Sequence, residues 1–145
     1  MGDDEISIHS MPGFMIRRLH QLHDSIWEKE LGGVFTPPQF GVLATLAARP
    51  GIHQQKLCSL VALDSSTGSD VVNRLIRAGL IRRRRDEHDR RRYLLELTAK
   101  GRASLTETAP SVVEVNARLT RALPESDRAA LLAHIDRILS EEPGR

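Results

Sequence analysis

An arginine-rich stretch between residues 74 and 92 constrains this chain more than any other part of its sequence. Nine arginines and three acids give the stretch a net charge of +6, whereas the rest of the chain has 12 basic and 16 acidic residues. The arginines are Arg74, Arg77, Arg82, Arg83, Arg84, Arg85, Arg90, Arg91 and Arg92. A basic block on an acidic body is typical of a surface that binds a polyanion. An ordinary solvated face is the alternative, and the position of the block in the fold decides between the two.

The C-terminal half of this stretch is predicted to form a β-hairpin. Residues 80–85 and 92–97 are two short extended runs, and the polar residues 86–89 separate them. Two such runs joined by a short polar turn are typical of a hairpin. We call this hairpin, residues 80–97, the wing.

The rest of the chain is predicted to be helical. Apolar residues recur at three- and four-residue spacing, and proline, glycine or capping residues bound each segment. Six helices are expected at about residues 11–31, 36–48, 53–62, 65–78, 98–122 and 125–141. The fifth contains Pro110, a residue type that can kink a helix. The expected fold is mainly α with a small β-hairpin wing (α+β), a winged helix-turn-helix.

The fourth helix has the features of a DNA-recognition helix. Val71, Val72, Leu75 and Ile76 form one apolar stripe that is expected to pack on the third helix. The opposite face offers candidate DNA contacts: Ser65, Ser66, Thr67, Ser69, Asn73, Arg74 and Arg77. A recognition helix inserts its N-terminal residues into the major groove, where short polar side chains reach base edges. The alternative to a recognition helix is an ordinary surface helix with a serine-rich N-terminal cap. Arg74 and Arg77, near the C-terminal end of the helix, could also bind phosphates instead of bases.

The wing favours the DNA-binding interpretation. Arg90 and Arg91 lie at its turn, and arginine at a protruding tip suits the negative potential of a narrow minor groove. Asp89 is unusual at a DNA surface unless it has a structural role. We therefore expect Asp89 to pair with a wing arginine and to brace the loop.

These residues together resemble the MarR family of transcription regulators. The matching segments are residues 64–67, 72–75, 79–83, 86–92 and 97–101, in the family's order, within about residues 36–101. The resemblance implies a homodimer that binds an inverted repeat, usually as a repressor, and that a small ligand releases. It also implies that Arg91, two residues after Asp89, reaches the minor groove, and that Asp89 braces the wing.

The terminal helices are expected to form a dimer. The apolar faces of the first, fifth and sixth helices cannot all be covered by a core built from residues 36–100, so a shared intersubunit core is expected. We therefore divide the chain into residues 1–35 (N-terminal dimerisation helix), 36–100 (DNA-binding lobe) and 101–145 (C-terminal dimerisation helices), within one compact domain.

A small aromatic carboxylate is the expected effector. In the family that the sequence resembles, such acids bind between the dimerisation helices and the DNA-binding lobe. Arg17 and His20 could supply a carboxylate partner and a hydrogen bond, and Trp27 and Phe40 a flat apolar wall. Simple packing and surface charge are the alternative for each of these four residues.

Two sensing roles are also considered. Cys58 could be a redox sensor, but its place beside Leu57 and Leu60 is typical of a small buried residue. His20 and His23 have a spacing that can bind a metal, with His9 or Glu28 as further ligands. We expect no metal and no cofactor. A redox- or metal-sensing regulator of the same fold is kept as the alternative function.

Other classes of protein lack support in the sequence. It has no glycine-rich phosphate loop, metalloprotease helix motif or nucleophile elbow, so we do not expect an enzyme. It also has no apolar run of about 18 residues that could span a bilayer. A single cysteine and an acidic N-terminus favour the cytoplasm. A module that binds an acidic protein through the wing is a further alternative.

Overall fold

The computed structural model describes residues 7–141, which divide into two compact units. One unit contains residues 7–26 and 113–141, and the other contains residues 27–112. The boundaries between the units therefore fall inside the first and fifth helices, and the DNA-binding lobe expected at residues 36–100 lies within the second unit. Within residues 7–141, no helix combines the length and the apolar character needed to cross a membrane.

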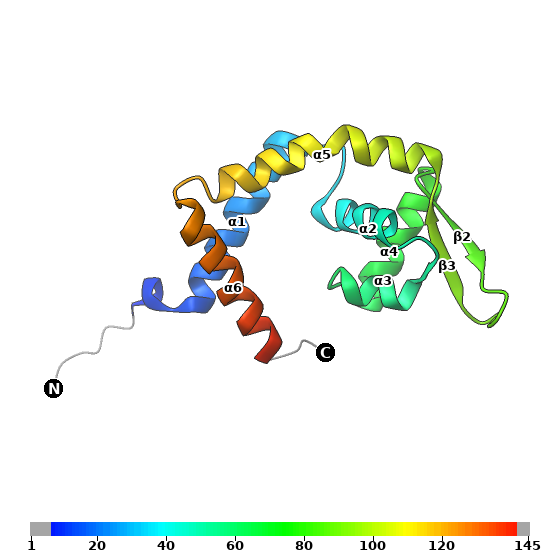
Figure 1. Cartoon of the computed structure of the whole chain (residues 1–145), viewed down its shortest axis with the longest axis horizontal. Coiled ribbons are helices and arrows are strands. Elements are labelled where there is room, and N and C mark those ends of the chain that lie inside the picture. The colour runs from blue at the N-terminus through cyan, green and yellow to red at the C-terminus, as the bar shows by residue number, and fades with distance from the viewer. Residues whose placement is uncertain (1–6, 142–145) are drawn as a thin grey trace. The chain divides into compact units, whose positions relative to one another are not determined.

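Six α-helices form, as the sequence predicts, and a short 3-10 helix, η1 (Ile8–Ser10), precedes them. The helices are α1 (Pro12–Leu31), α2 (Pro37–Ala48), α3 (Gln54–Leu60), α4 (Ser65–Arg77), α5 (Ala99–Leu119) and α6 (Glu125–Glu141) (Figure 1). α5 continues through Pro110. The expected class, mainly α with a small β wing, is confirmed.

Local capping explains where α2 begins and where α4 begins and ends. At α2, Thr36 Oγ1 accepts from the backbone N–H of Gln39, whose side chain accepts from the N–H of Thr36 in return. At α4, Asp64 accepts from the backbone N–H of Thr67 at 2.8 Å. Gly79 ends α4 with φ +74°, a conformation that other residue types rarely adopt.

The wing belongs to a three-stranded antiparallel sheet of order β1-β3-β2, which has one strand more than expected. Strands β2 (Ile81–Arg85) and β3 (Tyr93–Leu97) form the predicted hairpin, and β1 (Ile52–His53) pairs with the outer side of β3. The third helix begins at Gln54 with His53 as its N-cap, close to the predicted start at about residue 53, but the sequence analysis did not predict β1 directly before it. A strand of two residues is too short to show a period in the sequence.

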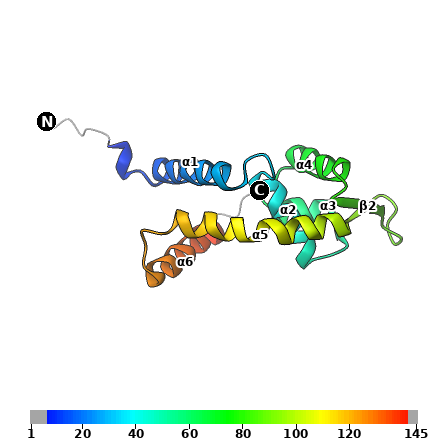
Figure 2. The same ribbon diagram turned by 90° about the horizontal axis from the view of Figure 1, so that it is seen from above.

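One leucine-rich core joins the elements of the second unit. Leu43 and Leu46 of α2, Leu57 of α3, Leu75 of α4 and Leu95 of β3 are all fully or almost fully buried. Because helices and sheet share this core, α4 and the base of the wing are held in fixed relative positions. Figure 2 shows the hairpin extending beyond the helices of this unit.

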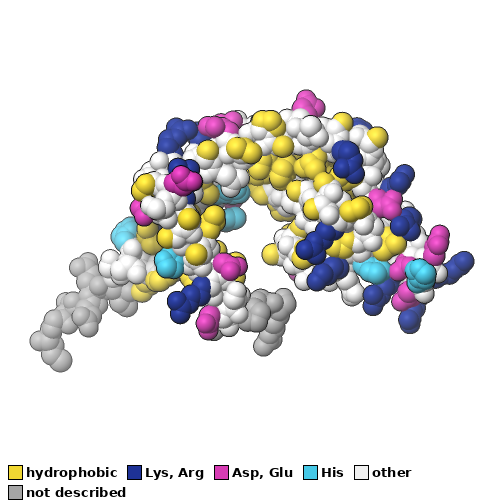
Figure 3. Space-filling model, in the orientation of Figure 1, with side chains coloured by type: hydrophobic (Ala, Val, Ile, Leu, Met, Phe, Trp, Pro, Cys, Tyr) yellow, Lys and Arg dark blue, Asp and Glu magenta, His cyan; other side chains and the backbone are white. Residues whose placement is uncertain are grey.

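The first unit leaves apolar helix faces exposed. Leu132, Ile138 and Leu139 of α6 are 67%, 61% and 65% exposed, and apolar side chains are visible over α6 in Figure 3. Exposed apolar residues also occur on α1, where Ile16 is 60% exposed. A single chain therefore leaves much of the apolar faces of α1 and α6 exposed, as the sequence analysis predicted.

Gly68 provides a test of the close approach between α3 and α4. A Cβ atom at this position would overlap Cys58 Sγ. Gly68→Ala should therefore lower the free energy of unfolding by about 1–3 kcal/mol, as overpacked cores do. Urea denaturation followed by circular dichroism measures the change.

The double variant Cys58→Ala, Gly68→Ala is the control, because it removes the sulfur atom that the new methyl group meets. We expect a favourable coupling energy between the two substitutions. Additive effects would show that the two residues do not limit the approach of the helices.

Candidate nucleic-acid interface

The N-terminal part of α4 presents an exposed polar face. Ser65, Ser66 and Thr67 are exposed, and Ser69 is partly buried. Thr67 also donates its hydroxyl to the Asp64 carboxylate at 3.0 Å. The hydrogen bonds from Thr67 lower the pKa of Asp64, so that a carboxylate caps the positive end of the helix. Thr67 is thus engaged in capping the helix, and Ser65 and Ser66 are exposed beside it.

Arg83 connects the wing to α4. Its Nη2 atom donates to Asn73 Oδ1 of α4 at 3.2 Å and to Gln54 Oε1 of α3 at 3.1 Å. Gln54 in turn donates to Ser69 Oγ at 3.3 Å. Four residues on three elements thus form one hydrogen-bonded chain. It positions two of the predicted DNA contacts, Asn73 and Ser69.

Arg85 extends the same face of β2 toward the wing turn. It donates to Tyr93 Oη at 2.9 Å and to the carbonyl oxygen of Arg90 at 2.7 Å. The guanidinium carbons of Arg83 and Arg85 both lie 5.1 Å from the centre of the Tyr93 ring. Cation–π contacts of this kind add attraction between the strands of the wing.

The other face of the hairpin is a compact ion-pair cluster. Arg82 and Arg84 both bind Glu96, at 3.1 Å and 2.7 Å. The register explains the cluster, because Arg82 is paired with Glu96 across the strands. Hydrogen bonding to Arg84 lowers the pKa of Glu96 and keeps it ionised. These two arginines are therefore partly neutralised within the protein.

Asp89 organises the turn of the wing. Its Oδ1 atom accepts from the backbone N–H of Arg91 at 3.1 Å and from Arg91 Nε at 3.2 Å, and Oδ2 lies 3.6 Å from Arg92 Nε. The Arg91 side chain is nevertheless 91% exposed. The contacts therefore orient the guanidinium group of Arg91 without burying it, which is the arrangement expected of a brace.

A second acid, Asp86, links the wing to a residue outside the hairpin, and the sequence analysis did not predict this contact. Asp86 is buried; it accepts from the backbone N–H of His88 at 2.9 Å, and His53 Nε2 lies 2.7 Å from its Oδ2. These contacts lower the pKa of Asp86. Asp86 and His53 are 33 residues apart, so no local pattern could have identified the pair.

Two of the candidate arginines have no partner inside the protein. Within residues 7–141, the guanidinium groups of Arg74 and Arg90 make no hydrogen bond or ion pair. Arg77 reaches only the backbone oxygen of Asn73, at 3.4 Å. In Figure 3, basic side chains gather with several acidic ones at the end of the hairpin. The exposed guanidinium groups of Arg74 and Arg77 thus lie on α4, and that of Arg90 lies at the wing turn.

The predicted ligand-pocket residues fall into two pairs. Trp27 and Phe40 meet edge to face in the second unit, with their ring centres 6.0 Å apart. Trp27 is buried and its indole N–H donates to the carbonyl oxygen of Phe35 at 2.7 Å. Arg17 and His20 are exposed on the part of α1 that belongs to the first unit. The indole N–H of Trp27 therefore already has a hydrogen-bond acceptor within the second unit.

Cys58 and the α1 histidines differ in their surroundings. Cys58 is buried, and desolvation raises the pKa of its thiol, which disfavours the reactive thiolate. His20 and His23 lie beside Asp24, and this group does not include His9 or Glu28. His9 instead packs edge to face on Phe14.

Comparison with known proteins identifies the family. The MarR family model matches residues 35–92. The chain is 35% identical over 95 residues to the transcriptional regulator HosA of Escherichia coli. These aligned residues make up 66% of this chain and 70% of HosA.

Two solved structures of regulators are similar over nearly their whole length. PcaV of Streptomyces coelicolor, in complex with its natural ligand, has a TM-score of 0.89 and 33% identity, covering 93% of this chain and 96% of PcaV. BpsR of Bordetella bronchiseptica, whose DNA binding is regulated by 6-hydroxynicotinic acid, has a TM-score of 0.88 and 26% identity, with coverages of 91% and 95%. With its winged helix-turn-helix and these similarities, the chain belongs to the MarR family of transcription regulators.

Proposed function

We propose that this regulator is a repressor that binds an inverted-repeat DNA operator as a homodimer and is released by a small aromatic carboxylate. The observation that carries the proposal is the link from Arg83 to Asn73, which joins the wing to the polar face of α4. A helix and a hairpin coupled in this way can enter a major groove and the adjacent minor groove together.

On this proposal, each part of the surface has a separate task. Base edges in the major groove are contacted by the N-terminal face of α4, at Ser65, Ser66, Thr67, Ser69, Asn73 and Arg74. Arg74 and Arg77 are also suited to phosphates, because both end in exposed guanidinium groups on the last turns of α4. Arg90 and Arg91 enter the flanking minor groove, where a narrow A·T-rich stretch attracts arginine.

A second copy of the chain would provide the homodimer. The exposed apolar residues of α1 and α6 need a partner, because contiguous exposed apolar surface usually marks an interaction site. Two copies related by a twofold axis would present two wings and two α4 helices to successive major grooves. An operator with twofold symmetry would match this arrangement.

Arg17 is the residue we propose for the effector carboxylate. It is an exposed cation on α1, and a guanidinium group binds a carboxylate with two parallel hydrogen bonds. The ligand regulation of BpsR supports an aromatic acid as the class of effector. Release follows if the effector binds better to a conformation in which the two DNA-binding lobes no longer match the operator.

Selection of bound sequences from random DNA duplexes tests the DNA-binding part of the proposal. We expect a palindrome whose half-sites are about one helical turn apart. Affinity for this sequence should fall steeply with salt, because several phosphates are neutralised. A lack of enrichment, or binding that salt does not weaken, would favour the module that binds an acidic protein instead.

The wing generates a prediction in which charge and geometry act in opposite directions. Arg91→Ala should weaken operator binding by about 1–3 kcal/mol. Asp89→Asn should also weaken it, although it removes a negative charge, because the brace on Arg91 is lost. Fluorescence anisotropy with a labelled operator measures both variants.

Glu87→Gln is the matched control, because it removes an exposed negative charge from the same turn. We expect this variant to bind as tightly as the wild type or more tightly. If Asp89→Asn also strengthens binding, electrostatics dominates and Asp89 is not a brace.

The effector prediction is tested on the protein–operator complex. Benzoate, hydroxybenzoates and 6-hydroxynicotinate should include a compound that dissociates the complex, whereas cyclohexanecarboxylate, which has the same charge, should not. Arg17→Ala should bind the operator normally and lose the response. If the entire panel leaves the complex intact, the effector class is wrong, while the DNA-binding proposal stands on its own test.

A further inference from the structure

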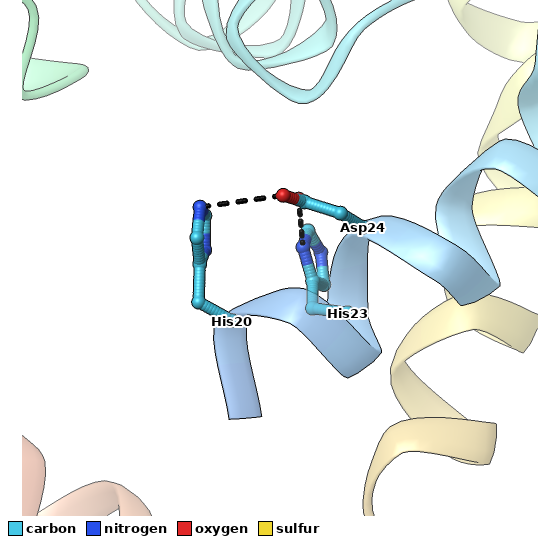
Figure 4. A group of neighbouring side chains, drawn as sticks. All are labelled: His20, His23 and Asp24. Atoms are coloured by element: carbon cyan, nitrogen blue, oxygen red, sulfur yellow. Dashed lines mark hydrogen bonds and ion pairs between the residues drawn. The ribbon is translucent and has the colours of Figure 1, made fainter. Parts of the chain in front are cut away.

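One turn of α1 carries three neighbouring side chains of types that can bind a metal ion, His20, His23 and Asp24 (Figure 4). His20 Nε2 lies 3.4 Å from Asp24 Oδ2, and His23 Nδ1 lies 3.4 Å from Asp24 Oδ1. The two imidazole rings are nearly parallel, with their centres 6.4 Å apart and an interplanar angle of 17°. The carboxylate of Asp24 therefore lies between two ring nitrogens that both point toward it.

The spacing in the sequence explains why the three side chains meet. Positions i, i+3 and i+4 lie on one face of an α-helix, and metal sites on helices use these spacings. His20, His23 and Asp24 occupy these three positions. One rigid helix therefore supplies all three ligands, and no rearrangement of the fold is needed to bring them together.

The distances fit the coordination of a small divalent ion. Zinc binds histidine nitrogen and carboxylate oxygen at about 2.0–2.2 Å, so the ligand atoms of a tetrahedral site lie about 3.3–3.5 Å apart. Both nitrogen–oxygen distances here are 3.4 Å, and one ligand atom from each residue can be chosen so that all three lie within 4.8 Å of one another. Small side-chain rotations would bring the two histidines onto the same ion.

The exposure of the group leaves room for solvent ligands. The side chains of His20 and Asp24 are 72% and 54% exposed, whereas that of His23 is 23% exposed. An open site with three protein ligands completes its coordination with water. Imidazole nitrogen suits zinc, nickel and copper, whereas magnesium and calcium prefer oxygen ligands alone.

We propose that His20, His23 and Asp24 form a binding site on α1 for a divalent transition-metal ion of the class of zinc, nickel or copper. All three ligands belong to the unit formed by residues 7–26 and 113–141, and Asp24 and His23 are not among the residues that we propose to contact DNA or the effector. The site also gives His20 a role other than contact with an aromatic carboxylate.

Cobalt(II) chloride and zinc chloride are the probes, applied to the full chain without an affinity tag. Cobalt should produce visible absorption bands that saturate at one ion per chain, and zinc should displace it. His20→Ala and Asp24→Asn should each weaken binding at least about 10-fold, since even the loss of a residue behind a metal ligand has an effect of about that size.

His134→Ala on α6 is the control, because it removes an exposed histidine of the same unit that is not in the cluster. This variant should bind cobalt as the wild type does. His23→Gln, checked by circular dichroism for an unchanged helix content, provides a third ligand test at a less exposed position. Absence of the cobalt bands, or equal binding by the His20, His23 and Asp24 variants, would overturn the proposal. Neither result depends on DNA, so the test is separate from that of the regulatory function.

Discussion

The hydrogen bonds of one guanidinium group, that of Arg83, join the wing to α3 and α4 and so hold together the surface that we propose for DNA binding. Arg83 lies two residues beyond Ile81, where β2 leaves the leucine core, and the strand continues into solvent with only one neighbouring strand. Leu95, the strand partner of Arg83, still belongs to the core, and beyond this pair neither β2 nor β3 contributes a residue to it. The contacts of Arg83 with Gln54 and Asn73 extend the fixed region outward, because a charged donor makes stronger hydrogen bonds than a neutral one. The wing and α4 thereby become one surface.

Much of the positive charge of the wing is used inside the protein. Arg82 and Arg84 share Glu96, and Arg91 and Arg92 share Asp89. The net charge of +6 between residues 74 and 92 therefore describes the long-range field. Within residues 7–141, Arg74 and Arg90 are the candidate arginines whose guanidinium groups form no hydrogen bond or ion pair. Pairing within the protein reduces the number of available cations but fixes their directions. Fixed directions favour recognition of a defined DNA geometry over indiscriminate binding to phosphates.

The two units obtain their stability in different ways. The second unit has its own core, in which Leu43, Leu46 and Leu95 have no exposed surface. The first unit exposes much of the apolar surface of α6, so within residues 7–141 this helix lacks an opposing layer that would cover its apolar face. α1 carries both an exposed apolar stripe and the histidine cluster, and it therefore combines a surface for protein association with a group of polar ligands.

The sequence alone determined the helices, the hairpin and the family. Proline, threonine and glycine at the ends of periodic apolar segments act within a few residues, so these elements and the Asp89–Arg91 contact were open to prediction. The histidine cluster on α1 also follows from spacing along a single helix. Only the tertiary structure decided that β1 joins the sheet, that Asp86 meets His53, and that Arg83 reaches Gln54 and Asn73. Packing of the core brings these segments together although they are distant in the sequence. Local sequence patterns, such as the spacing of apolar residues or helix caps, cannot predict which distant residues will be in contact.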